Sequence, residues 1–204
     1  MKVGLYFGTF NPIHVGHLII ANFMTETSEL DQVWIVVSPQ NPLKKKKNLL
    51  DDFHRLSLVR AAIEDNPKLK VSDIEFHLPT PSYTSTTLTY LQEKHPEDEF
   101  ALIMGEDNLR TFHKWFNHEL ILENHKIYVY PRARTIQEEE EQFKGETEVG
   151  NGFSKHRNVE MCNDVPVMKI SSSLIRNTLK KGEDVRYLLT EPVYHYIDEM
   201  NFYR

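Results

Sequence analysis

The chain has 204 residues, of which 40% are hydrophobic, so it can bury a substantial core. Its net charge of −6 disfavours broad nucleic-acid binding, which relies on a basic face, but leaves room for a small anionic ligand held by a few focused cations. The single cysteine, Cys162, excludes an internal disulfide, and no apolar run approaches a membrane span. We therefore expect a cytoplasmic protein with neither membrane nor nucleic-acid partners.

The first half of the chain alternates apolar runs with amphipathic ones. We expect strands at 2–7, 32–38 and 69–76, and helices at 15–28, 49–65 and 82–95. The apolar face of the helix at 49–65 is predicted from residues at three-four spacing, namely Leu50, Phe53, Leu56, Val59, Arg60 and Ile63.

The second half continues this alternation and then interrupts it. Strands are expected at 99–105 and 126–131, with a short helix at 118–124 between them. Residues 133–165 are polar and carry four consecutive glutamates, typical of a solvated helix face rather than of a carboxylate metal site. The pattern leaves open whether this stretch is flexible and what it does. A strand, a helix and a closing helix are expected in 166–204.

This order predicts a doubly wound α/β fold over a single domain spanning 1–204. Strands that alternate with helices and are almost wholly apolar indicate a mostly parallel sheet with helices on both faces. Such Rossmann-like sheets bind ligands beyond the carboxyl ends of their strands. Candidate residues are therefore sought where strands end.

The first candidate is the corner "YFGTFNPIHVGH", residues 6–17, which follows the first strand. Gly8 allows close approach of a ligand to the backbone, and a helix expected to begin near residues 13–15 directs free N–H groups into the same space. His14 and His17 are three residues apart and share one helical face. These features favour a phosphate site. A zinc site and plain capping or core histidines remain alternatives.

A second candidate is "ISSSLIRNTL", residues 170–179, where an expected strand leads into a helix. Ser171, Ser172 and Ser173 offer hydroxyls and helix caps, and Arg176 follows one turn later. The pattern fits a second phosphate-binding site. It equally fits an ordinary serine cap with a surface arginine.

Two further stretches follow strands. The lysines Lys44–Lys47 could meet a polyphosphate or form solvated surface. After the strand at 99–105, Gly105 allows close approach and Asp107 could accept from ribose hydroxyls. Trp115 is either a core anchor or an aromatic platform.

Taken together, these motifs carry a family resemblance. "GTFNPIHVGH" resembles the nucleotidyltransferase pattern GxFxPxHxGH, and "ISSSLIR" resembles the ISSTxIR element of the same superfamily. "SYTSTTLTYL", "GEDNLRTFHKW" and "KIYVYPR" are similar to segments of the bacterial nicotinate-nucleotide adenylyltransferases. The resemblance implies a Rossmann-like nucleotidyltransferase that converts ATP and nicotinate mononucleotide to deamido-NAD and pyrophosphate. It also implies Mg²⁺ carried by the ATP phosphates.

The resemblance also implies roles for individual residues. It assigns His14, His17, Ser172 and Arg176 to the ATP phosphates, together with a lysine such as Lys44, although the run leaves open which lysine acts. It assigns backbone contacts along the nucleotide to Gly8, Thr9 and Phe10, the adenosine side to Gly105 and Asp107, and the pyridine ring to Tyr83, Thr84 and Trp115. Asn11 departs from the pattern, which has a frequent aspartate there.

The expected chemistry is direct transfer, because a nucleotide phosphate is mostly dianionic at pH 7 and needs no general base. No lysine or arginine lies in 77–93, so we expect helix amides, with Ser82 or Thr84 as cap, to recognise the nicotinate carboxylate. Transfer to nicotinamide mononucleotide or phosphopantetheine is an alternative. So is a nucleotide-sensing protein without turnover. The oligomeric state stays open.

Overall fold

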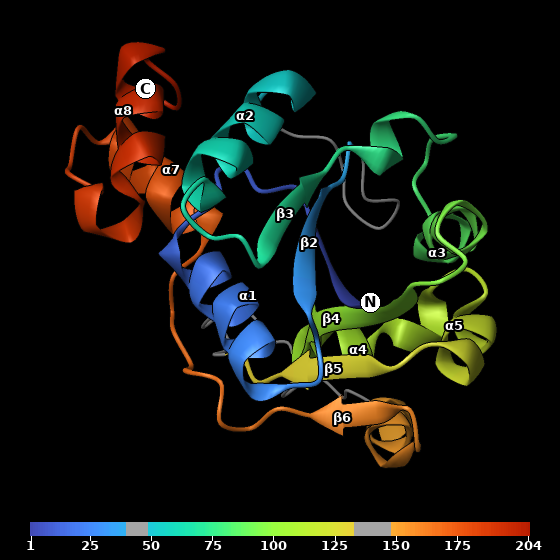
Figure 1. Cartoon of the computed structure of the whole chain (residues 1–204). Helices are drawn as coiled ribbons and strands as arrows, with labels where there is room; N and C mark the ends of the chain where they lie inside the picture. Colours follow the sequence, from blue (N-terminus) through green and yellow to red (C-terminus); the bar gives the residue numbers. More distant parts are fainter. Residues whose placement is uncertain (40–48, 133–147) are drawn as a thin grey trace.

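The fold is built on a six-stranded parallel sheet (Figure 1). The structure is a computed structural model that describes residues 1–39, 49–132 and 148–204. The strands run in the order β3-β2-β1-β4-β5-β6, and all neighbours are parallel. They are β1 (Lys2–Gly8), β2 (Gln32–Val37), β3 (Leu69–Ser72), β4 (Glu99–Gly105), β5 (Ile127–Tyr130) and β6 (Val159–Met161). The predicted doubly wound α/β fold is confirmed.

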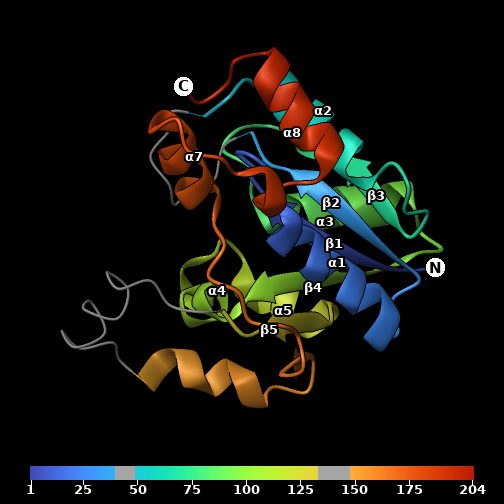
Figure 2. The same ribbon diagram turned by 90° about the vertical axis from the view of Figure 1, so that its left-hand side faces the viewer.

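Helices cover both faces of the sheet (Figures 1 and 2). One apolar cluster joins the sheet to α1 (Val15–Thr27), α2 (Asp52–Ile63), α7 (Ser172–Lys180) and α8 (Glu191–Glu199). The other joins it to α3 (Thr84–Lys94), α4 (Glu106–Arg110) and α5 (His118–Asn124). Short 3-10 helices lie at η1 (Ile74–Phe76), η2 (Phe112–Lys114), η3 (Glu148–Lys155) and η4 (Arg186–Leu188). No helix in the described part of the chain is long and apolar enough to cross a membrane.

The strand order creates a switch point beside β1. This strand pairs with β2 on one side and with β4 on the other, so the chain winds outward in opposite directions from the β1–β4 junction. Open α/β sheets form a ligand crevice at the carboxyl ends of the strands at such a point. The corner after β1 therefore lies where a ligand is expected.

Two predictions about strands are wrong. Residues 166–170 form no strand, although their pattern resembled one. Instead β6 lies at 159–161, inside the stretch that was expected to be polar and irregular, and pairs with β5. The strand predicted at 69–76 is shorter than expected. It ends at Ser72, and the chain then forms the 3-10 helix η1.

The buried face of α2 also differs from the prediction. Phe53 is 63% exposed, and Arg60 lies on the surface. Arg55, by contrast, is completely buried. The helix begins after Asp51, whose side chain caps it by accepting from the Phe53 amide. The lysines at 44–47 and the four-glutamate run lie outside the described residues.

Candidate active site

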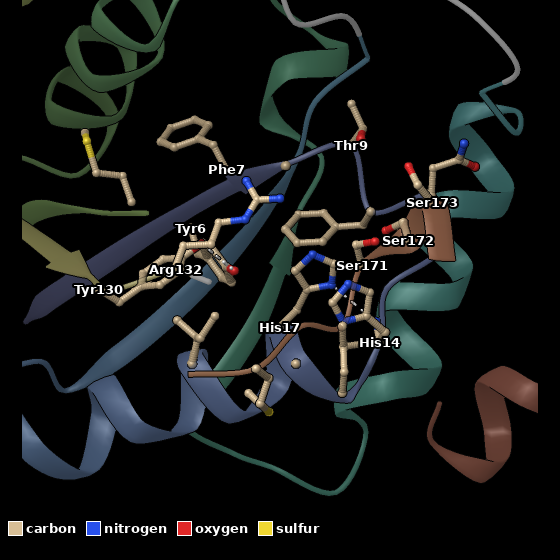
Figure 3. Close-up of a pocket in the computed structure, with 18 of the residues that line it drawn as sticks. Tyr6, Phe7, Thr9, His14, His17, Tyr130, Arg132, Ser171, Ser172 and Ser173 are labelled. Carbon is tan, nitrogen blue, oxygen red and sulfur yellow. Dashed lines mark hydrogen bonds between the residues drawn. The ribbon is translucent and has the colours of Figure 1, made fainter. Parts of the chain in front are cut away.

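A pocket of about 380 Å³ opens at the carboxyl ends of β1, β4 and β5. It lies between the N-terminal turns of α1 and α7, which approach each other although they are far apart in the sequence (Figure 3). The structure brings together in its lining the predicted residues Gly8, Thr9, Phe10, His14, His17, Ser172 and Arg176. The first and second candidate motifs thus form one site.

The turn after β1 is tightly packed. A Cβ on Gly8 would lie 2.8 Å from Cζ of the Phe10 ring, so only glycine leaves room for that ring. Phe10 itself is buried and has a φ of 44°, a left-handed conformation that side-chain-bearing residues rarely adopt. The surrounding contacts must hold this turn in place.

The two histidines form a stacked pair at the start of α1. Their ring centroids are 3.6 Å apart and the planes differ by 21°. The backbone N–H of His14 donates to Nδ1 of His17 at 3.2 Å. Because Nδ1 of His17 accepts, the neutral ring carries its proton on Nε2. This bond gives His17 one defined N–H donor.

Both histidines are neutral at neutral pH. Burial, with the nearby charge of Arg132 as a smaller contribution, lowers the pKa of His14 to about 4. Burial, with His14 and Arg132 as smaller contributions, also holds the pKa of His17 well below its ordinary value. The pair therefore offers uncharged N–H donors. Among the residues that the structure describes, no group of three His, Cys, Asp or Glu side chains could hold a metal ion.

The N-terminus of α7 is fastened to the corner after β1. Ser171 is the N-cap, and its hydroxyl accepts from the Leu174 amide at 3.1 Å, which confirms the predicted serine cap. The Ser172 hydroxyl donates to the carbonyl of Pro12 at 2.8 Å. Arg176 donates through Nη1 to the carbonyl of Asn11 at 2.7 Å. The two helix starts are thus fixed relative to each other.

Asn11 connects this corner to two distant segments. Its Oδ1 accepts from the Leu50 amide at 3.1 Å and from the Tyr203 hydroxyl at 2.7 Å. Both contacts need only an acceptor oxygen, which asparagine supplies as aspartate would. The departure from the family pattern at position 11 therefore keeps these two bonds.

The residues predicted for the adenosine side reach the pocket indirectly. Neither Gly105 nor Asp107 lines it, but Asp107 forms an ion pair with Arg132, which does. Tyr130, also in the lining, contacts Tyr6 through a hydroxyl–hydroxyl hydrogen bond of 3.2 Å. Arg132 and Tyr130 were not among the predicted site residues. Their position directly at the end of a strand was the available signal.

The residues predicted for the pyridine ring lie outside this pocket. Tyr83 is the N-cap of α3 without a side-chain cap, so the prediction that Ser82 or Thr84 caps this helix is wrong. The Trp115 indole N–H is buried and has no hydrogen-bond partner in the described parts of the chain. The Trp115 ring packs on Phe112 at 5.4 Å, as a core anchor would.

The segment leading into α7 forms one wall of the pocket. Pro166, Met168 and Ile170 line it, and Figure 1 shows the chain running from β6 to α7. These apolar residues had been read as a strand. They form no strand and instead line the same pocket as the two histidines.

Comparisons with known proteins agree with this geometry. The family model described as cytidylyltransferase-like matches residues 5–178. Over its full length and theirs, the chain is 55% identical to a probable nicotinate-nucleotide adenylyltransferase of Flavobacterium psychrophilum and 56% identical to that of Flavobacterium johnsoniae. It also resembles the structure of Plasmodium falciparum nicotinic acid mononucleotide adenylyltransferase complexed with NaAD, with a TM-score of 0.78 at 21% identity, covering 99% of this chain and 97% of that one. The chain belongs to the cytidylyltransferase-like family and, within it, to the nicotinate-nucleotide adenylyltransferases.

Proposed function

We propose that this protein transfers the adenylyl group of ATP to nicotinate mononucleotide, giving deamido-NAD and pyrophosphate in NAD biosynthesis. The observation that carries the proposal is the convergence of two helix N-termini, the His14–His17 pair and Arg176 on one pocket at the switch point of the sheet. Helix N-termini and cationic or N–H donors bind phosphates. The full-length identity to probable nicotinate-nucleotide adenylyltransferases supports the choice of acceptor.

The reaction needs alignment and charge stabilisation more than acid–base chemistry. The acceptor phosphate is already largely dianionic, so it can attack the α-phosphorus of ATP without a general base. As pyrophosphate leaves, negative charge grows on the phosphate oxygens, and prearranged donors stabilise it. We assign this role to His14 and His17, whose neutral rings donate without bringing a charge.

We propose that Mg²⁺ arrives with the ATP phosphates. The described residues that line the pocket offer hydroxyls, imidazoles, amides and guanidinium groups, and none of them is acidic. Such a lining fits a cation held by phosphate oxygens and water, as Mg²⁺ often is. When bound, the ion neutralises phosphate charge, and Arg176 adds a fixed positive charge beside it.

The acceptor is proposed to bind at the N-terminus of α3. This helix has no side-chain cap, so its first amides are available to an anion such as the nicotinate carboxylate. We assign Tyr83 and Thr84 to the carboxylate end and Trp115 to the ring. Nicotinamide would present an NH₂ group to these donors, and leaving a buried polar group unpaired costs about 1–3 kcal/mol.

Three further proposals complete the assignment. Gly105 and Asp107 are proposed to act on the adenosine side, with Asp107 working through Arg132. The chain is proposed to fold as one domain and to work in the cytoplasm, which suits its free thiol at Cys162. A lysine of the 44–47 run is proposed to meet the triphosphate.

The test measures the rate of pyrophosphate release in the presence of ATP and Mg²⁺. Nicotinate mononucleotide, nicotinamide mononucleotide and phosphopantetheine are supplied in turn as the acceptor. We expect kcat/KM for the nicotinate form to exceed that for the amide by about tenfold to a few hundredfold. Equal rates or an amide preference would assign a different acceptor. ATP binding without turnover on any acceptor would indicate a nucleotide sensor.

A further inference from the structure

Arg55 is a charged side chain with no access to solvent, although it lies on α2 outside the pocket lining. Its guanidinium donates to the backbone carbonyls of Leu50 at 3.1 Å, Thr9 at 2.6 Å and Ser38 at 2.9 Å. It also pairs with the carboxylate of Asp52. A buried guanidinium is costly unless it is fully hydrogen-bonded, so these contacts indicate a specific purpose.

The three carbonyls belong to separate segments at one edge of the sheet. Thr9 follows β1, Ser38 follows β2, and Leu50 precedes α2. Arg55 therefore joins the ends of β1 and β2 to the helix that covers them. The adjacent carbonyl of Gly8 is also occupied, because it accepts from the Ser38 amide at 2.8 Å.

The hydrogen bonds to the Gly8 and Thr9 carbonyls fix the orientation of the N–H groups that follow them in the chain. In a trans peptide the C=O and the following N–H point in opposite directions. With the Thr9 carbonyl turned toward Arg55, the Phe10 N–H points away from Arg55, and both Thr9 and Phe10 line the pocket. The Thr9 and Phe10 amides make no hydrogen bond to any residue in the described ranges. They are available to a ligand.

The turn also needs an external restraint. Phe10 has a φ of 44°, and a non-glycine residue in this region persists only where its surroundings hold it. The bond from Arg55 to Thr9 acts on the peptide unit directly before Phe10. It is the contact best placed to keep this conformation.

We infer that Arg55 is a positioning residue for phosphate binding: by holding the Thr9 carbonyl it aims the Phe10 amide at the polyphosphate of ATP, next to the Thr9 amide, whose peptide is held by the Ser38 amide. The inference rests on the proposed function for the identity of the nucleotide. A planar guanidinium can serve several carbonyls at once, whereas a lysine ammonium is a compact point donor on a flexible stem. Arginine is thus required for geometry as well as for charge.

The experiment compares R55K with two controls. R60K makes the same change on the surface of α2, and D52N removes the acidic partner while leaving the three carbonyl contacts. Calorimetry without acceptor gives Kd for ATP and for adenosine. We expect R55K to weaken ATP about ten- to hundredfold, the scale for losing hydrogen bonds to a charged ligand, with adenosine changed less than about twofold. Both controls should stay within about twofold for either ligand.

A loss of affinity shared equally by ATP and adenosine, or unchanged ATP binding, would overturn the inference. Where R55K is too unstable for calorimetry, the rise in Tm produced by ATP and by adenosine gives the same comparison, since ligand-induced stabilisation follows Kd. These measurements need no acceptor. They therefore remain decisive even if pyrophosphate-release assays reject nicotinate mononucleotide.

Discussion

The corner after β1 and the N-terminal region of α3 differ in how their polar side chains are held, although His14 Nδ1 at the corner is also buried without a partner in the described ranges. At the corner, Ser172 and Arg176 donate to backbone carbonyls, and Asn11 accepts two hydrogen bonds. Near α3, the Ser85 hydroxyl and the Trp115 indole N–H are buried without a partner in the described ranges. The first region is assembled in advance, and the second lacks hydrogen bonds that a ligand could supply.

This difference separates two tasks of a group-transfer enzyme. Stabilising charge that grows during the reaction requires donors that are already fixed. Selecting an acceptor benefits instead from buried groups that only the correct ligand satisfies, because a wrong ligand leaves them unpaired. Figures 1 and 2 place the two helix starts, α1 and α3, on opposite faces of the sheet. Substitutions in each region should therefore have distinct kinetic signatures.

The largest effect is expected at the preassembled corner. His17→Ala should lower kcat by about 10²–10³-fold, the usual scale for deleting one stabilising donor, with a smaller effect on acceptor KM. His17→Gln, which can present an amide N–H near the position of Nε2, should recover part of the loss. Steady-state kinetics with both substrates varied would check this. Near-normal turnover combined with a lowered Tm would mean that the histidine is structural.

The buried histidines also make stability depend on pH. Since folding lowers the pKa of His14 from 6.5 to about 4, the unfolded chain binds a proton first as the pH falls. The free energy of unfolding should therefore decrease between pH 6.5 and 4, by up to about 3 kcal/mol from His14 alone. Urea unfolding of the wild type and His14→Gln across this range measures the contribution. Parallel curves would contradict it.

A moderate effect is expected in the region near α3. Trp115→Ala should reduce kcat/KM about tenfold for nicotinate and nicotinamide mononucleotides alike, because ring stacking does not distinguish acid from amide. The KM for ATP should change little. Competition assays with both acceptors test this, and Tyr90→Ala on the exposed side of α3 serves as a control. A change in the acid-to-amide ratio would show that Trp115 contacts the carboxylate end.

The smallest effect is expected from the lysine run. Replacing Lys44–Lys47 together by glutamine should raise the KM for ATP a few-fold and flatten its dependence on salt, since exposed charges are screened. Single replacements should matter less, because neighbouring lysines can substitute. If the KM for ATP matches that of the wild type at every salt concentration, the four lysines do not contact the triphosphate.

The corner after β1 could be predicted because its signals are contiguous. Gly8, His14 and His17 lie within ten residues, and a strand followed by a helix places them at one edge of the sheet. Strand β6 could not be predicted in the same way. It has three residues, pairs with one neighbour, and is no more than half-buried, so it carries no apolar run. Strand β6 is defined by its backbone hydrogen bonds to β5, which the local sequence does not reveal.

Arg55 and the segment at 166–170 show a second limit. Arg55 is buried because the carbonyls of Thr9 and Ser38, from two other segments, converge on it with that of nearby Leu50, a fact that helical periodicity does not contain. Met168 and Ile170 alternate as in a strand, but they line a pocket instead of pairing. In both cases the partners come from elsewhere in the chain. The local hydrophobic pattern predicts helices and strands well, but it predicts contacts between distant segments of the chain poorly.

The hydrogen bond from Tyr203 to Asn11 joins residues 192 positions apart. At ordinary rates of translation, about 5–20 residues per second, the segment bearing Asn11 is made about 10–40 s before Tyr203. Throughout that interval the nascent chain carries the nucleotide corner without one of its supports. The corner thus acquires its full set of contacts only after Tyr203 has been made.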